Sequence, residues 1–284
     1  MNAQLDDLPF TPSRGASSDS LEYPVRLARA LATIGAGPRA VHRVTRRTRR
    51  TARFLVHGAN HLRREIVPMP EGREAARASQ GYAGFMSENI CALNGFDVRV
   101  SGPIPDQPAL LVCNHIGWQD GILINSVVPS LAVIKSEVSA WPLVGELARG
   151  FRYLFIERGN AHSGARLLLE ARRRLDQGCS ILTFPEGTTT HGEGILDFHR
   201  GVFGLSRLTG YPIVPIALRY ELGAEAAWVG DDSFFPHFVK TVARARTVST
   251  LDFGAPMQAR SDERAEDFAA RVRDVMLALL QTRP

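Results

Sequence analysis

Between residues 96 and 254, short runs of apolar residues alternate with longer segments of helical periodicity. Runs such as LLVC (110–113), LAVI (131–134) and ILTF (181–184) are too short for helices and carry no charge, which is typical of strands buried on both faces. Strands of this kind, separated by helices, are the signature of an α/β fold. The sequence therefore predicts an α/β fold with a mixed, mostly parallel central sheet flanked by helices.

The expected elements fill most of the chain from residue 71 onward. Strands are expected over 96–102, 108–113, 131–135, 153–156, 179–184, 211–220 and 248–254. Helices are expected over 71–93, 120–128, 141–150, 162–178 and 261–281. A chain of 284 residues can form one large domain with an N-terminal appendage.

The N-terminal part of the chain has a different composition. Residues 1–20 are rich in Ser, Asp and Pro, and we expect them to form a disordered lead. Residues 21–64 hold eleven Arg and a single acidic residue, Glu22, with apolar residues interspersed. The net charge of the whole chain is +5, and an excess of Arg suits an anionic partner because the planar guanidinium matches phosphate.

We expect residues 21–70 to form a basic helical arm that lies on an anionic membrane surface. A helix packed on the main domain with a solvated basic face is an alternative. Nucleic-acid binding is a third interpretation, but no nucleic-acid motif accompanies the Arg residues, and we expect no such partner.

The expected membrane association is peripheral or monotopic, on the cytoplasmic face. No segment contains the roughly 18 or more mostly apolar residues that a membrane-spanning helix needs. The acidic start, MNAQLDDLPF, is unlike a signal peptide.

The three cysteines, Cys91, Cys113 and Cys179, have neither the spacing of a metal site nor the even number of a disulfide framework. We expect no metal, no disulfide and a reducing compartment. Cys113 precedes His115 by two residues, so a Cys-His nucleophile is one interpretation of this pair. The apolar run before Cys113 instead indicates the buried end of a strand.

The segment LVCNHIGWQD places His115 directly after a buried strand and Asp120 five residues later. On one straight helix these residues would not share a face. If His115 lies in the turn and Asp120 begins the next helix, the carboxylate can meet the imidazole Nδ1. That contact fixes the tautomer and leaves Nε2 to take a proton from a hydroxyl, as in a Ser-His-Asp triad whose hydroxyl comes from the substrate. A His115 that only stabilises the turn is the alternative.

Polar residues also follow two other expected strands. Glu157, Arg158 and Gly159 follow the strand of YLFIERGN, and Arg158 suits an anionic head group. Glu186 and Thr188 follow the strand of CSILTFPEGTTT. Ligands collect at strand ends of α/β sheets, so these residues are candidates for one site. The alternatives are a surface ion pair in the first segment and a plain turn in the second.

Taken together, these segments resemble the glycerolipid acyltransferase family typified by bacterial 1-acylglycerol-3-phosphate acyltransferases. NHIGWQD is similar to the family's N-H-x4-D block, FIERG to its second block, FPEGTTT to its third and VPIAL (214–218) to its fourth. The blocks occur in the family's order and spacing. The resemblance implies an acyltransferase domain over 71–284, transfer of an acyl chain from acyl-CoA or acyl-carrier protein to a lysolipid, and no cofactor.

The resemblance also implies roles by position. His115 would be the general base and Asp120 its partner. The substrate-binding positions would be Asn114, Glu157, Arg158, Gly159, Glu186, Gly187, Thr188, His199, Arg200 and Pro215. Arg158 would contact the acceptor's phosphate. Backbone N–H groups near the His115 turn, or in the 185–188 turn, would hold the oxyanion.

One position departs from the pattern of the phosphatidate-forming members. They have a Phe-Lys-x-Gly stretch whose Lys supports the phosphate, whereas this chain has His199 at the Lys position, followed by Arg200. The leading expectation is 1-acyl-sn-glycerol-3-phosphate as acceptor, giving phosphatidic acid in membrane lipid biosynthesis. FPEGTTT and AWVGDDSFFPHF (227–238) are similar to members that acylate lyso-ornithine lipid, the alternative acceptor. A non-catalytic lipid-binding protein is the alternative of another class.

Overall fold

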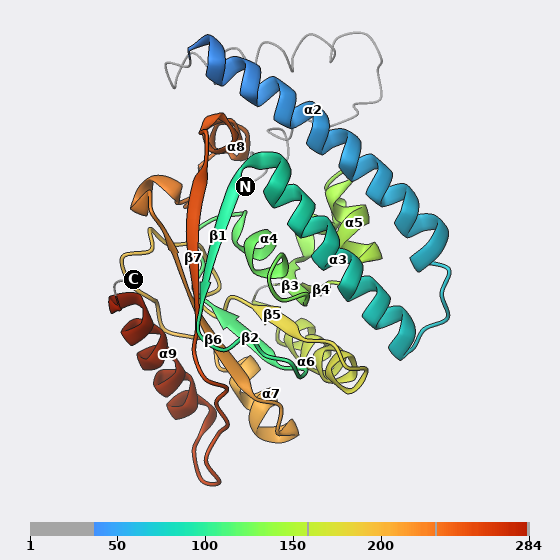
Figure 1. The fold of residues 1–284 in the computed structure, drawn as a ribbon. Coiled ribbons are helices and arrows are strands. Elements are labelled where there is room, and N and C mark those ends of the chain that lie inside the picture. The colour runs from blue at the N-terminus through green and yellow to red at the C-terminus, as the bar shows by residue number, and fades with distance from the viewer. Residues whose placement is uncertain (1–36, 158, 231, 283–284) are drawn as a thin grey trace.

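A seven-stranded sheet with helices on both faces forms the centre of the computed structural model, which describes residues 37–157, 159–230 and 232–282 (Figure 1). The strands are β1 (Phe96–Ser101), β2 (Leu110–Cys113), β3 (Leu131–Lys135), β4 (Leu154–Ile156), β5 (Ile181–Thr183), β6 (Ile213–Tyr220) and β7 (Thr247–Phe253). Their order across the sheet is β1-β7-β6-β2-β5-β3-β4.

The helices lie mostly between these strands in the sequence. They are α2 (Pro38–His61), α3 (Arg73–Asn94), α4 (Asp120–Asn125), α5 (Val144–Gly150), α6 (Ala161–Asp176), α7 (Gly201–Thr209), α8 (Phe234–Ala243) and α9 (Ala265–Gln281). Short π or 3₁₀ segments are η1 (Leu62–Ile66), η2 (Ser136–Ala140) and η3 (Gly223–Ala226).

The sheet is mixed and mostly parallel, as the sequence predicts. Strands β6, β2, β5, β3 and β4 are parallel neighbours, whereas β7 pairs antiparallel with β6 and parallel with β1. The carboxyl ends of the five parallel strands therefore share one edge of the sheet. The segments that follow β2, β5 and β4 begin at this edge, and they contain the residues proposed from the sequence to form the site, except Pro215, which lies within β6.

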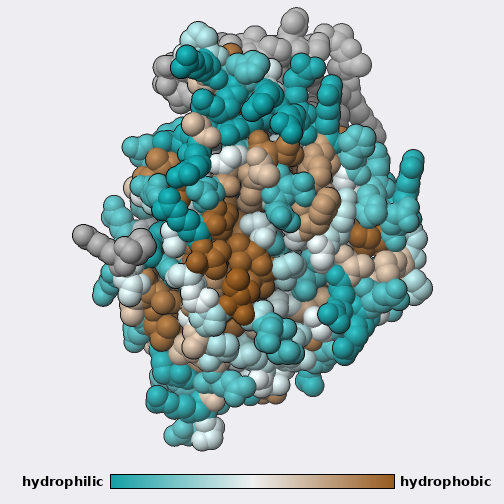
Figure 2. All heavy atoms as spheres, viewed as in Figure 1, coloured by the Kyte–Doolittle hydropathy of each residue, from teal (hydrophilic) through white to brown (hydrophobic). Residues whose placement is uncertain are grey.

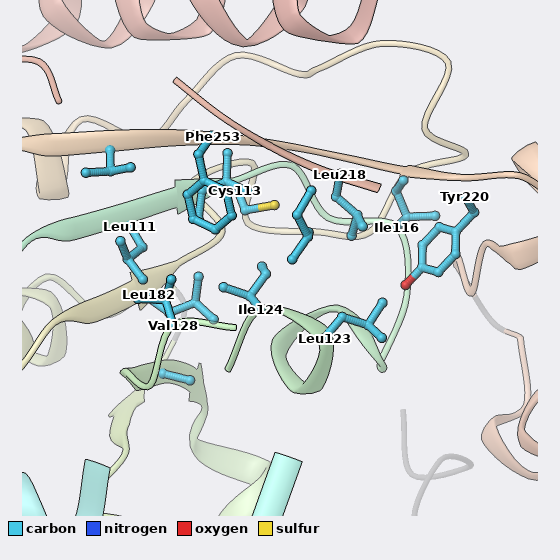
Figure 3. Close-up of a cluster of buried hydrophobic side chains, with 14 of the residues drawn as sticks. Leu111, Cys113, Ile116, Leu123, Ile124, Val128, Leu182, Leu218, Tyr220 and Phe253 are labelled. Carbon is cyan, nitrogen blue, oxygen red and sulfur yellow. The ribbon is translucent and has the colours of Figure 1, made fainter. Parts of the chain in front are cut away.

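The two faces of the sheet have separate cores. Leu111 and Cys113 of β2 pack with α3 and α4 on one face, as Figure 3 shows for this cluster. Leu110 and Val112, which alternate with them, pack with α6, α7 and α9 on the other face. Burial on both faces explains why the strands are continuous apolar runs and show no alternation with polar residues.

The N-terminal helix α2 packs on the main body through α8, α3 and α5. Val44 is fully buried against the apolar side of α8. Arg47 is also buried, and its guanidinium donates to the backbone carbonyls of Val242, Arg244 and Ala245 at the C-terminal end of α8. Arg43 likewise donates to the carbonyl of Ala243, so two arginines of the basic run cap a helix of the domain.

The outward face of α2 is strongly basic. Its exposed residues include Arg39, Arg46, Arg49, Arg50 and Arg53, and the surface over α2 is largely hydrophilic (Figure 2). The helix is therefore both packed on the domain and basic towards solvent, which combines features of two interpretations of its sequence. No helix in the described part of the chain is long and apolar enough to cross a bilayer. The proposed disordered lead, and the expected arm before residue 37, lie outside the described residues.

Several boundaries differ from the expected ones, and two helices, α7 and α8, are additional. The last helix begins at Ala265, later than the expected residue 261. The chain before it forms a turn in which Glu263 accepts hydrogen bonds from the backbone of Arg260 and the guanidinium of Arg271. The helix α3 ends at Asn94, within one residue of the expected end: Gly95 has φ +73°, and a side chain there would meet Arg47.

Candidate active site

The turn between β2 and α4 holds the central pair of the site. His115 lies in the turn, and Asp120 is the first residue of α4. The imidazole Nδ1 lies 2.8 Å from Asp120 Oδ2, so the contact expected from the spacing is present. Because the chain folds back before the helix begins, two residues five apart meet.

The carboxylate of Asp120 is fully buried and accepts four hydrogen bonds. Oδ2 accepts from the backbone N–H groups of Ile116 (2.6 Å) and Gly117 (2.9 Å) as well as from His115. Oδ1 accepts from the hydroxyl of Tyr220 at 2.6 Å. A carboxylate in this setting assigns the proton of His115 to Nδ1 and leaves the Nε2 lone pair available as a base.

Tyr220 is a site residue that the sequence alone does not reveal. It is the last residue of β6, and its ring belongs to the core on the α4 side of the sheet (Figure 3). Burial and the neighbouring Asp120 raise the pKa of Tyr220 well above its ordinary value, so the hydroxyl stays a donor. Its partner is 100 positions away, which no local motif indicates.

Glu186 lies beside His115, in the turn after β5. Its Oε1 accepts from the backbone N–H of His115 at 2.8 Å, and its Oε2 accepts from the N–H of Leu196 at 2.9 Å. Glu186 is 5% exposed, and burial raises its pKa. The carboxylate therefore connects the His115 turn to Leu196 in the loop between β5 and α7, with each of its oxygens engaged by the backbone.

The imidazole of His115 remains accessible from one side. Its side chain is 21% exposed, and its ring stacks on Phe184 with the centroids 4.1 Å apart. The backbone carbonyl of His115 accepts from the N–H of Thr190 at 2.8 Å. The ring is therefore held by Phe184 and Asp120, while part of the side chain stays exposed.

Two of the proposed binding residues are buried in the sheet. Asn114 is fully buried, and its amide exchanges hydrogen bonds with the backbone N–H and carbonyl of Leu218, which joins the end of β2 to β6. Pro215 is a buried residue of β6 opposite Val112. Both positions act on the shape of the site through the strands.

The third block brings Gly187 and His199 together. Gly187 has φ +71°, and a Cβ at that position would lie 2.8 Å from His199 Nε2. His199 and Thr188 are exposed at this edge. Arg200 points elsewhere, because its guanidinium pairs with Glu266 of α9 at 2.6 Å and is 75% exposed.

The segment after β4 is more distant from His115. Glu157 and Gly159 are exposed there, and Glu157 accepts a hydrogen bond from the amide of Asn160 at 3.0 Å. Three strand spacings separate β4 from β2, which amounts to roughly 14 Å. Arg158, the proposed phosphate ligand, lies outside the described residues.

Cys113 has the environment of a structural residue. It is fully buried at the end of β2, and burial raises its pKa well above the ordinary value of a thiol. A nucleophilic cysteine needs an accessible thiolate. The Cys-His interpretation is therefore excluded, and Cys91 and Cys179 are likewise free and buried.

Comparison with known proteins agrees with the resemblance seen in the sequence. The family described as Acyltransferase matches residues 96–219. The chain is 34% identical to the lyso-ornithine lipid O-acyltransferase of Pseudomonas aeruginosa, over 77% of this chain and 85% of that protein. It is 28% identical to the 1-acyl-sn-glycerol-3-phosphate acyltransferase of Neisseria meningitidis serogroup B, over 64% of this chain and 71% of that protein.

The fold is similar to a solved structure. The crystal structure of the 1-acyl-sn-glycerophosphate (LPA) acyltransferase from Thermotoga maritima matches with a TM-score of 0.61 and 20% sequence identity, covering 86% of this chain and 98% of that chain. The predicted α/β class is thereby confirmed. With the His115–Asp120 pair at the end of β2 and relatives of this identity and coverage, the chain belongs to the acyltransferase family.

Proposed function

We propose that this protein transfers a fatty acyl group from a thioester donor to the hydroxyl of a lysolipid, in membrane lipid synthesis. The observation that carries the proposal is the contact between His115 Nδ1 and the buried carboxylate of Asp120, with the imidazole partly exposed. The names of the relatives, which are lysolipid acyltransferases, support the class of acceptor.

In the proposed reaction the lysolipid hydroxyl attacks the thioester carbonyl while Nε2 of His115 takes its proton. A C–O bond forms, and the tetrahedral intermediate then breaks its C–S bond. The imidazolium, held by Asp120, returns the proton to the departing thiolate. No residue of the protein becomes acylated.

Several N–H groups of the His115 turn are already engaged. Those of Ile116 and Gly117 donate to Asp120, and that of His115 donates to Glu186. This favours the N–H groups of Glu186 and Thr188 as oxyanion donors, since Pro185 has no N–H group and that of Gly187 donates to the carbonyl of Phe184. We propose that Glu186 positions the His115 turn through the backbone, and that Gly187, Thr188 and His199 meet the acceptor.

We propose lyso-ornithine lipid as the preferred acceptor, with 1-acyl-sn-glycerol-3-phosphate as the second candidate. The relative that acylates lyso-ornithine lipid is 34% identical, against 28% for the glycerophosphate enzyme. His199 replaces the phosphate-supporting Lys, and the neighbouring cation, Arg200, is paired with Glu266 of α9. Recognition of 1-acyl-sn-glycerol-3-phosphate would depend on Arg158 as the ligand of its phosphate.

We propose that the exposed Arg face of α2 meets the anionic cytoplasmic face of a membrane. At least five arginines lie on that face, whereas Val44 and Ala59 of the helix pack on the domain and the large apolar residues it exposes are Val41 and Val56. For the described part of the arm, attraction between charges is therefore the main attachment.

The test is acyl transfer by the purified protein. Radiolabelled acyl-CoA and acyl-carrier protein are each supplied with lyso-ornithine lipid, 1-acyl-sn-glycerol-3-phosphate or lysophosphatidylcholine, and the products are separated by thin-layer chromatography. We expect the highest kcat/KM with lyso-ornithine lipid. A higher value with the glycerophosphate would overturn the acceptor assignment, and no transfer to any lysolipid from either donor would overturn the activity.

A further inference from the structure

The chain from the end of η3 into α8, described over 226–230 and 232–238, makes three hydrogen bonds to the catalytic turn. The backbone N–H of Trp228 donates to the carbonyl of Ile116 at 2.9 Å. The side-chain amide of Gln119 donates to the carbonyl of Ala226 at 3.3 Å. These two contacts use the backbone of the segment and can form with many side chains there.

The third contact depends on side-chain identity. The indole Nε1 of Trp118 lies 3.1 Å from Nδ1 of His237 on α8. An indole is a donor and not an acceptor, so Nδ1 must be the acceptor and the neutral imidazole carries its proton on Nε2, a buried atom without a hydrogen-bond partner among the described residues. The two residues are 119 positions apart, which connects α8 directly to the turn that carries His115 and Asp120.

The surroundings hold this pair in place. His237 is 9% exposed, and burial lowers its pKa, which keeps the imidazole neutral and able to accept. The Trp118 ring contacts the rings of Phe234 and Phe238 on the same helix, at 5.5 and 5.7 Å between centroids. Trp118 lies three residues after His115, so a shift of its ring moves the backbone that donates to Asp120.

We propose that His237 is a positioning residue for acyl transfer: by accepting the indole N–H of Trp118, it holds the catalytic turn in the geometry that aligns His115 with Asp120. Trp118 is the transmitting side chain. The effect on catalysis rests on His115 acting as the general base, whereas the contact itself does not. Neither residue needs to touch the substrate.

The chosen variants separate the hydrogen bond from the packing. His237→Leu removes the acceptor and leaves the half-buried indole N–H without this partner. His237→Asn keeps an acceptor oxygen near the position of Nδ1. Trp118→Phe keeps an aromatic ring against α8 and removes the donor. Tyr211→Phe is the control, since it removes a hydroxyl that donates to Asp176 at 3.0 Å on the surface.

We expect His237→Leu to lower kcat by about tenfold or more with KM for the lysolipid changed less than about threefold, because misplaced reacting groups lose rate more than binding. Trp118→Phe should likewise lower kcat much more than it changes KM. His237→Asn should retain at least about a third of the kcat, and Tyr211→Phe should match the wild type. Equal loss in the Leu and Asn variants would overturn the proposal, as would an unchanged kcat in folded His237→Leu.

The contact has its own readout. The chain has three Trp, so 15N labelling gives three indole N–H resonances, and Trp118→Phe identifies the one in question. We expect that resonance to be protected from exchange and to move in His237→Leu but not in Tyr211→Phe. An unmoved resonance would refute the contact, and a moved resonance with unchanged kcat would refute the positioning role. If His237→Leu does not fold, Trp118→Phe decides: a wild-type kcat there overturns the proposal.

Discussion

The hydroxyl of Tyr220 gives the sharpest energetic test of the site. It donates to Asp120 Oδ1 at 2.6 Å, and the carboxylate is fully buried. Tyr220→Phe leaves that oxygen without its donor while the ring still fills the core. A hydrogen bond to a buried charged group is worth about 1.5–3 kcal/mol. We expect the free energy of unfolding to fall by that amount, which lowers Tm by roughly 3–12 °C in a protein of this size.

The same substitution elsewhere provides the control. Tyr211 also donates to an aspartate, Asp176, at 3.0 Å, but that pair is exposed. We expect Tyr211→Phe to change the unfolding free energy by less than about 0.5 kcal/mol. Urea denaturation of both variants measures the difference, and kcat of Tyr220→Phe should fall by about tenfold as the carboxylate tilts. Equal unfolding free energies for the two variants would refute the reasoning.

Three further outcomes follow from the geometry. Glu186→Gln puts an NH₂ group against one backbone N–H and should lower kcat by about 10–100-fold in a folded protein; a rate near wild type would show that the carboxylate is dispensable. Iodoacetamide should leave Cys113 of the native protein unmodified by mass spectrometry, since its thiol is buried and its pKa is raised; rapid alkylation would argue against a structural role. Replacing Arg46, Arg49 and Arg53 by Gln should weaken binding to anionic vesicles by about 100-fold, at about 1 kcal/mol each, and high salt should release the wild type; salt-resistant binding would show that apolar residues dominate.

The pairing of His115 with Asp120 could be predicted because both partners lie within six residues, where the turn into a helix decides whether they meet. The parallel strands could be predicted for a similar reason, since their continuous apolar runs reflect burial on both faces. Tyr220 could not, because its donor role depends on the register of β6 against β2.

The sequence was least informative about the basic segment. A cluster of arginines gives the charge but not which face of the helix is buried, so the capping of α8 by Arg47 is visible only in the structure. The helix α8 itself contains Pro236 and successive aromatic residues, which obscure its periodicity. Because α8 was not expected, nothing in the sequence indicated a role for His237.

The most direct test of the account is the rate of acyl transfer to a lysolipid by His115→Ala. The variant protein should remain folded, because the imidazole is partly exposed and the buried Asp120 keeps three other donors. We predict that kcat falls by about 10²–10⁴-fold, the usual contribution of a general base. A folded His115→Ala protein that acylates the lysolipid at close to the wild-type rate would contradict the central claim.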